Sequence, residues 1–288
     1  MRKAARFGFY TGPVVGAGLP LTAAVAAIAA GCSSHGSSPW EARLRATEGY
    51  MGNRQGIPHI ALVAGGRSYG WRSLASVPAA STVKPFLMVA YLDQPAVRNR
   101  SLTQDEQDLL MQMVGGSNNA ATAVIHGRLG PRWLRAEKRK FGLSHLQIPP
   151  TDWGAAQTTA AEQASFFSNM LLEIPPRHRA FAQAALASSP PEQQWGILQA
   201  RPPGWTVLSK NGWGSPNGEF AASVGLFIHG PRRVALAIYV TASPSRDYAQ
   251  ETIAGLAQRI MRPGPGVTSQ PLACHASRAT MRPRDDTA

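Results

Sequence analysis

Four residues near the start of a largely apolar segment could form and break an acyl ester. Ser81-Thr82-Val83-Lys84 stands at the beginning of a helix predicted over 81–92. Residues i and i+3 share a helix face, so the Ser81 hydroxyl and the Lys84 amine can approach each other. Apolar surroundings make a lysine a base near neutral pH, and the free N–H groups of a helix start favour developing negative charge. The pattern predicts a Ser81 nucleophile activated by Lys84, with a capping serine beside an unrelated lysine as the alternative.

Ser117-Asn118-Asn119 supplies a second hydroxyl and two amides between two predicted helices. Acyl transfer needs a proton donor for the leaving group and a group that orients the lysine or the substrate carbonyl. Ser117 could relay the proton and Asn119 could orient the substrate. A simple helix cap at a turn is the alternative, because the same S-x-N pattern occurs twice more in the chain.

A third motif, Lys210-Asn211-Gly212-Trp213, comes at the end of a predicted strand. A lysine there could bind a substrate carboxylate, and Gly212 would let the strand backbone approach the substrate. The next N–H group, that of Trp213, could complete an oxyanion hole together with the N–H of Ser81. An ordinary edge-strand lysine is the alternative, because K-x-G occurs at a second place in the chain.

The elements that must position these motifs follow an α+β order. Two strands precede a long helical region, and three strands and a final helix follow it. This order predicts one antiparallel sheet, built from the N- and C-terminal segments, with flanking helices and an inserted helical subdomain. Capping boxes at Thr103 with Glu106 and at Thr159 with Glu162 mark two helix starts. Strands are expected over 57–64, 67–71, 205–211, 220–228 and 234–241, and helices over 40–50, 81–92, 104–114, 119–128, 132–140, 160–172, 177–187 and after Ser245.

The N-terminal region has the pattern of an export signal rather than of a fold. A basic start, an apolar middle and small residues before Cys32 predict a signal peptide over 1–31. Ala29-Ala30-Gly31-Cys32 resembles a bacterial lipobox, which implies a lipidated Cys32 and a protein on the outer face of the cell membrane. A plain secretory signal or an uncleaved anchor is the alternative. We expect a flexible tether over 32–39, one domain over 40–262 and a disordered tail over 263–288.

Composition excludes several classes of protein. With 44% hydrophobic residues the chain has enough apolar surface to fold, and two cysteines cannot build a disulfide scaffold. The net charge is +13, but the arginines are scattered and no nucleic-acid-binding motif accompanies them. The histidines show no zinc-hydrolase spacing, so no metal or cofactor is expected. We expect a monomer with no nucleic-acid partner.

In combination, the three motifs resemble the penicillin-recognising serine acyl-enzyme superfamily, which includes class A β-lactamases and D,D-peptidases. The resemblance covers about residues 40–261 and implies a β-lactamase/transpeptidase-like fold. It also implies a β-lactam or a peptidoglycan peptide as substrate. The resemblance implies that Ser81 is the nucleophile, Lys84 the base and Ser117 the proton relay. It implies that Asn119 orients the substrate and that Lys210 and Asn211 bind its carboxylate. It also implies that Gly212 and Trp213 border the cleft and that the Trp213 amide belongs to the oxyanion hole.

The chain departs from the family pattern at three points. Asn211 replaces the usual threonine or serine, and Trp213 is bulky for a residue that lines the cleft. The class A deacylation motif E-x-x-L-N is missing, and Asp152 is the one acid between residues 141 and 158. We therefore expect a serine hydrolase that forms a Ser81 acyl-enzyme and deacylates slowly. The alternative function is a non-catalytic binding or sensor lipoprotein that retains the fold.

Overall fold

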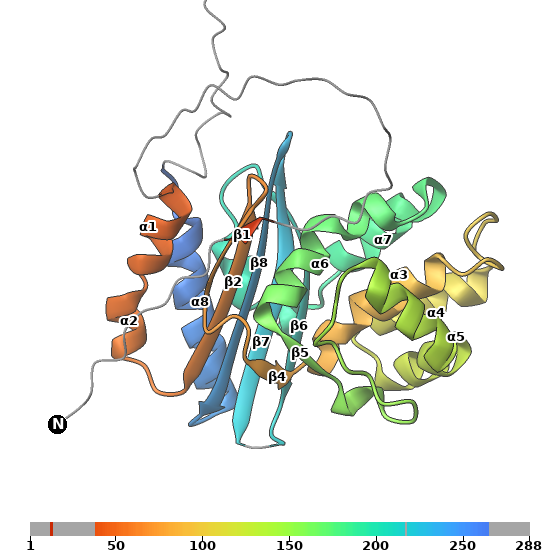
Figure 1. Ribbon diagram of the computed structural model, residues 1–288, viewed down its shortest axis with the longest axis horizontal. Coiled ribbons are helices and arrows are strands. Elements are labelled where there is room, and N and C mark those ends of the chain that lie inside the picture. The colour runs from red at the N-terminus through yellow and green to blue at the C-terminus, as the bar shows by residue number, and fades with distance from the viewer. Residues whose placement is uncertain (1–11, 14–37, 217, 265–288) are drawn as a thin grey trace, which may run out of the picture.

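A six-stranded antiparallel sheet forms the centre of the molecule (Figure 1). The computed structural model describes residues 12–13, 38–216 and 218–264. The strand order is β1-β3-β2-β8-β7-β6, so strands from the beginning of the chain lie beside strands from its end. This arrangement is the antiparallel α+β sheet that the sequence predicts. The strands are β1 (Gly12–Pro13), β2 (Ile57–Ala64), β3 (Arg67–Trp71), β6 (Thr206–Gly214), β7 (Glu219–His229) and β8 (Arg232–Ser243).

Both faces of the sheet are covered, and the alternation of side chains in β2 shows how. Ile60 and Leu62 belong to the core beneath the terminal helices, whereas Ala61 and Val63 belong to the core beneath the inserted helices. Figure 1 shows the terminal helices on one side of the sheet and α6 on the other. The terminal helices are α1 (Pro39–Arg45), α2 (Glu48–Gly52) and α8 (Arg246–Met261), and α6 spans Ala160–Glu173.

The inserted segment between β3 and β6 forms a helical lobe beside the sheet (Figure 1). The fully buried helix α3 lies at its centre and packs against α4, α5, α6 and α7. A small second sheet, of β4 paired antiparallel with β5, closes the lobe near the site. The elements of the lobe are β4 (Ser76–Pro78), the 3₁₀ helix η1 (Ala80–Val83), α3 (Lys84–Leu92), α4 (Gln104–Val114), α5 (Asn119–Lys140), β5 (Gln157–Thr159) and α7 (Arg179–Ala187).

Several predicted boundaries differ from the structure for identifiable reasons. The helix expected over 40–50 is two short helices, α1 and α2. The helices expected over 119–128 and 132–140 follow each other across a kink at Gly130, whose φ is 68° and which precedes Pro131. Strands β4 and β5 were not predicted, because three residues each are too few to show alternation. The predicted five long strands and the last helix are present, with ends that shift by three residues or fewer.

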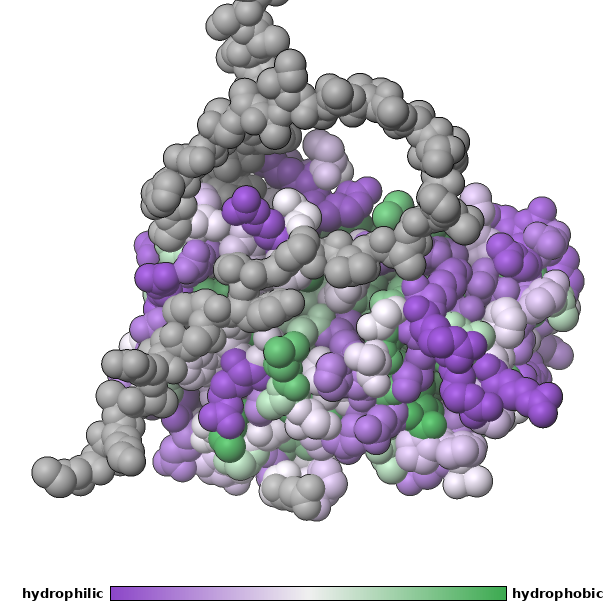
Figure 2. Space-filling view, in the orientation of Figure 1, coloured by the Kyte–Doolittle hydropathy of each residue, from purple (hydrophilic) through white to green (hydrophobic). Residues whose placement is uncertain are grey.

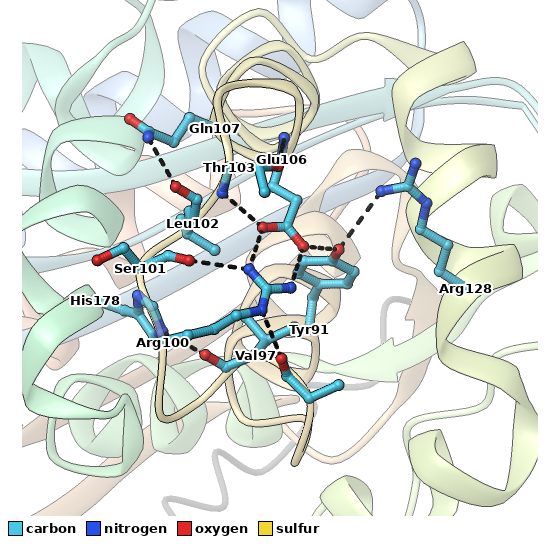
Figure 3. A network of polar contacts seen from close by, with 11 residues as sticks. Tyr91, Val97, Arg100, Ser101, Leu102, Thr103, Glu106, Gln107, Arg128 and His178 are labelled. Atoms are coloured by element: carbon cyan, nitrogen blue, oxygen red, sulfur yellow. Dashed lines mark hydrogen bonds and ion pairs between the residues drawn. The ribbon is translucent and has the colours of Figure 1, made fainter.

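A buried carboxylate fixes the start of α4 (Figure 3). The Arg100 guanidinium donates two hydrogen bonds of 2.7 Å to Glu106, and the Tyr91 hydroxyl donates a third of 2.8 Å. Thr103 completes the predicted capping box, because its side chain accepts from the Glu106 N–H and its own N–H donates to Glu106. The hydrogen bonds from Arg100, above all, lower the pKa of Glu106 to about 2. This network anchors the helix that leads into Ser117.

The face of the helical lobe that Figure 2 shows is mostly hydrophilic. Helix α5 carries four exposed arginines: Arg128, Arg132, Arg135 and Arg139. Within the described part of the chain, no helix is long and apolar enough to cross a membrane. The same residues contain no cluster of three or more metal-ligating side chains. Gly12 and Pro13, which form β1, are the two residues of the predicted signal peptide that the structure describes. The rest of that segment, Cys32 and all but two residues of the predicted tail lie outside the described residues.

Candidate active site

Ser81 and Lys84 are joined by one turn of 3₁₀ helix. The backbone N–H of Lys84 donates to the carbonyl oxygen of Ser81, and α3 continues from Lys84. Side chains three residues apart lie on the same side of such a turn. Ala80, which precedes the serine, has a φ of 43°, a conformation that residues other than glycine rarely adopt. The turn therefore brings Ser81 and Lys84 to one side of the chain, at a strained position of a kind that is common at functional sites. Among the described contacts, no hydrogen bond joins their two side chains, because the amine donates to Ser117 and Asn119 instead.

The Lys84 amine is completely buried and held by three contacts. Its Nζ donates to the Ser117 carbonyl oxygen at 2.6 Å, to Ser117 Oγ at 3.3 Å and to Asn119 Oδ1 at 2.9 Å. The ring centre of Trp153 lies 4.9 Å from the same nitrogen. Burial, and secondarily the charge of Lys210, lowers the pKa of Lys84 to about 7. A large share of these amines is therefore neutral at physiological pH, as a base must be.

The turn between α4 and α5 brings the second motif to this lysine. Ser117 has a φ of 55°, which reverses the chain between the two helices. The side chain of Asn118 accepts from the N–H of Ala121 and caps α5, so the helix-cap interpretation is correct for this residue. Ser117 and Asn119 on either side of the cap both contact Lys84. The tripeptide 117–119 thus combines a helix cap, Asn118, with two residues that contact Lys84.

Strand β6 is the outer strand of the sheet and lies against the turn that carries Ser81. A Cβ added at Gly212 would lie 3.0 Å from the Ser81 amide nitrogen and 3.2 Å from Ala80 Cβ. These contacts are tighter than most Cβ contacts, so a side chain at position 212 would require the strand or the Ser81 turn to shift by a few tenths of an ångström. Lys210 is 3% exposed, its Nζ donates to Gln193 Oε1 at 3.1 Å, and burial lowers its pKa to about 8. All three motifs of the sequence consequently meet at one place.

Asn211 is engaged inside the protein rather than toward the cleft. Its Nδ2 donates to the carbonyl oxygens of Gln193, at 2.7 Å, and Trp195, at 3.3 Å. Its Oδ1 accepts from Ser223 Oγ at 2.6 Å. The expected contact with a substrate carboxylate would require these bonds to break. The asparagine in place of the usual hydroxyl residue instead ties the segment around residue 193 to strands β6 and β7.

A cleft of about 440 Å³ opens above Ser81, and Trp213 stands at its rim. The indole of Trp213 is 37% exposed and packs edge-on against Trp195, with 6.2 Å between ring centres. It lines this cleft and also borders a second cavity near the start of α8. The cleft is lined by Ala80, Ser81, Gly116, Ser117, Asn119, Trp153, Gly154, Glu192, Gln193 and Trp213.

The short segment before α6 brings an indole to the cleft where the family resemblance leads us to expect a glutamate. Trp153 and Gly154 line the cleft, whereas Asp152 is exposed and accepts from the N–H of Gly154 at 2.9 Å. The second predicted capping box is only half formed, because Glu162 accepts from the backbone N–H of His145 at 2.6 Å. Glu162 thereby ties the segment to the start of α6. Asp152 is thus occupied as a cap and does not line the cleft.

Sequence reasoning missed Trp153, Glu192 and Gln193 as residues of the cleft. Glu192 and Gln193 lie in a polar, proline-rich stretch before β6 that matches no motif. Only the hydrogen bonds from Lys210 and Asn211 to Gln193 show that this stretch forms a wall of the site. No pattern in the sequence indicates those long-range contacts.

The fold and the three motifs together define a β-lactamase-like serine hydrolase architecture. The model of a family described as the beta-lactamase enzyme family matches residues 105–262, which is more than half of the chain. The chain therefore belongs to this family. No curated protein matches the chain significantly.

Solved structures of class A β-lactamases and of PBP-A share the fold. A class A β-lactamase from Bacteroides cellulosilyticus superposes with a TM-score of 0.67 at 14% identity, covering 78% of this chain and 98% of that one. A class A β-lactamase from Mycobacterium abscessus gives 0.63 at 19% identity, covering 77% and 98%. The structure of PBP-A gives 0.63 at 17% identity, covering 76% and 94%. At such low identity these likenesses establish the fold alone.

Proposed function

We propose that the protein is a serine hydrolase that forms an acyl-enzyme at Ser81 with β-lactams or cell-wall peptides. The observation that carries the proposal is the buried Lys84 amine, whose pKa of about 7 suits a base and whose contacts join it to Ser117 and Asn119. Membership of the beta-lactamase enzyme family supports the same chemistry.

In the proposed acylation, the neutral Lys84 amine takes the proton of the Ser81 hydroxyl as the oxygen attacks the substrate carbonyl. The carbonyl oxygen becomes negative and is stabilised by the N–H groups of Ser81 and Trp213. Ser117 then gives its proton to the leaving nitrogen and recovers one from the Lys84 ammonium, across the 3.3 Å contact between Nζ and Oγ. The C–N bond of the substrate breaks, and its acyl group stays on Ser81 as an ester.

Hydrolysis of that ester is proposed to be slow. It needs a base beside the ester that can deprotonate a water molecule. In the segment over 141–158, the residues that line the cleft are an indole and a glycine, Trp153 and Gly154, and Asp152 is engaged as a cap. Glu192 is the one acid among the described residues that line the cleft, and we propose that it does not take over this role. The loss of such a base costs about 10²–10⁴ in rate, so the acyl-enzyme should accumulate.

Intact-protein mass spectrometry during incubation with benzylpenicillin tests both steps. We expect one equivalent of adduct, mapped by peptide digestion to Ser81, and a burst of product followed by a slow steady phase. Ser81→Ala is the matched control and should give no adduct. An adduct at another residue, or none with a broad panel of β-lactams, would favour a non-catalytic binding protein. Fast linear turnover without a burst would contradict slow deacylation.

We further propose that the protein is exported and held by a lipid on Cys32 at the outer face of the cell membrane. The support is the basic start, the apolar middle and the lipobox-like Ala29-Ala30-Gly31-Cys32. A cell-wall substrate would then be within reach of the domain.

A further inference from the structure

Glu192 is a carboxylate on the wall of the cleft. It lines the same cavity as Ser81, Ser117 and Trp213. Its side chain makes no hydrogen bond or ion pair with any residue that the structure describes. We propose that Glu192 binds an ammonium group of the substrate, so that the site prefers acyl donors with a free amine. This inference rests on the proposed function, because it names the substrate class of that site.

The Glu192 side chain is exposed, so a bound ammonium can reach it from solvent, whereas the two amines near the cleft already have protein partners. The amine of Lys84 is held by Ser117 and Asn119, and that of Lys210 by Gln193. At the rim, the Arg246 guanidinium lies 3.5 Å from Asp247. Glu192 is the only acid among the described residues that line this cleft. An incoming ammonium is therefore attracted to it without displacing an internal partner.

The wall that carries Glu192 is fixed to the sheet, which gives its carboxylate a defined place. The next residue, Gln193, is 6% exposed. Its carbonyl oxygen accepts from Asn211 at 2.7 Å and its side-chain oxygen accepts from Lys210 at 3.1 Å. Two residues later, the Trp195 carbonyl oxygen accepts from the same asparagine. A residue anchored to rigid elements in this way can discriminate substrates better than one on a free loop.

Ser81 and Glu192 line one cleft, which gives the proposed ammonium site its place relative to the reacting carbonyl. Its volume of about 440 Å³ is that of a site for a single small molecule. A substrate that places its carbonyl at Ser81 therefore brings its nearby substituents to the wall that holds Glu192. The expected substrate is an acyl donor whose amine lies within a few bonds of the acyl carbon, such as an amino-acid residue with a free amino group.

Three penicillins with one core and different charges on the acyl side chain test this directly. Ampicillin carries an ammonium at the position where benzylpenicillin has hydrogen and carbenicillin has a carboxylate. Second-order rates of Ser81 acylation should fall in the order ampicillin, benzylpenicillin, carbenicillin, by about three- to fivefold per unit of charge. Glu192→Gln should abolish the order, Glu192→Lys should reverse it, and added salt should weaken it. Glu48→Gln, on the distant helix α2, removes the same charge and should leave the order intact.

Each other outcome overturns the inference in a distinct way. If the three penicillins acylate Ser81 with the same relative rates in the wild-type protein and in Glu192→Gln, ammonium binding by Glu192 is refuted. Acylation of Ser81 would still be established by that result. An equal loss of hydrolysis for all three compounds in Glu192→Gln would mean that Glu192 acts on water instead. Absence of acylation by any of the three would instead defeat the proposed function itself.

Discussion

The rate of Ser81 acylation should depend on pH through the protonation of Lys84. With a pKa of about 7, half of the Lys84 amines are neutral at pH 7, whereas an ordinary lysine with a pKa of 10.5 would be neutral in about one molecule in 3,000. Burial of the amine thus supplies a gain of about a thousandfold in available base at pH 7. Only the neutral form accepts a proton, so acylation should rise about tenfold per pH unit up to pH 7 and then level off.

The assay is the rate of labelling by a fluorescent penicillin from pH 5 to 9, stopped by denaturation and quantified on gels. Circular dichroism across the same range verifies that the fold persists. Lys84→Ala should lower the rate by about 10²–10⁴ and remove the inflection near pH 7. Lys210→Gln removes the charge that helps lower the pKa of Lys84, so the inflection should move to higher pH. A flat profile in the wild-type protein, or an unchanged inflection in Lys84→Ala, would refute Lys84 as the base.

Three further changes probe the strand, the lobe and the anchor. Gly212→Ala places a Cβ 3.0 Å from the Ser81 amide nitrogen, so acylation should fall about 10²-fold while thermal stability falls only moderately. Glu106→Gln should cost about 1–3 kcal/mol of unfolding free energy at pH 7 in urea titrations. The Glu106 carboxylate stabilises the fold above pH 4.5, and this stabilisation is lost toward pH 2, so the variant should converge with the wild type there. Cys32→Ala should release the protein from the membrane fraction of expressing cells; continued association would indicate an uncleaved anchor.

Most of the fold was predictable because its local signals agree with its packing. The five long strands and the helices of the lobe follow from periodicity, caps and turns, and the α+β order then leaves few topologies. The short strands β4 and β5 were not predicted, because they exist only through pairing with each other across the lobe. The 3₁₀ turn at Ser81 was not predicted either, because no sequence pattern requires the φ of 43° that Ala80 adopts.

The residues of the candidate site could be predicted from the sequence where they belong to short motifs. They could not be predicted where their place in the site depends on tertiary contacts. Ser81, Lys84 and Ser117 stand in short motifs, and the structure brings Lys84 within hydrogen-bond distance of Ser117. The position of Asn211 in a motif suggested substrate binding, but its amide reaches Gln193 and Trp195 instead. Those partners lie 16–18 residues away in a segment without regular periodicity, so only the folded chain reveals them.

The indole of Trp153 links the two halves of the proposed mechanism. Its ring lies 4.9 Å from the Lys84 nitrogen, on the segment that would carry a water-activating acid in class A enzymes. Burial lowers the pKa of Lys84, whereas an indole face by itself attracts the ammonium form, so burial is the larger of the two influences on this amine. Under the proposed mechanism the neutral amine serves acylation. The same segment presents an indole and a glycine to the cleft, so it supplies no water-activating base for the proposed ester. We therefore expect the proposed acyl-enzyme to last longer than one that has such a base.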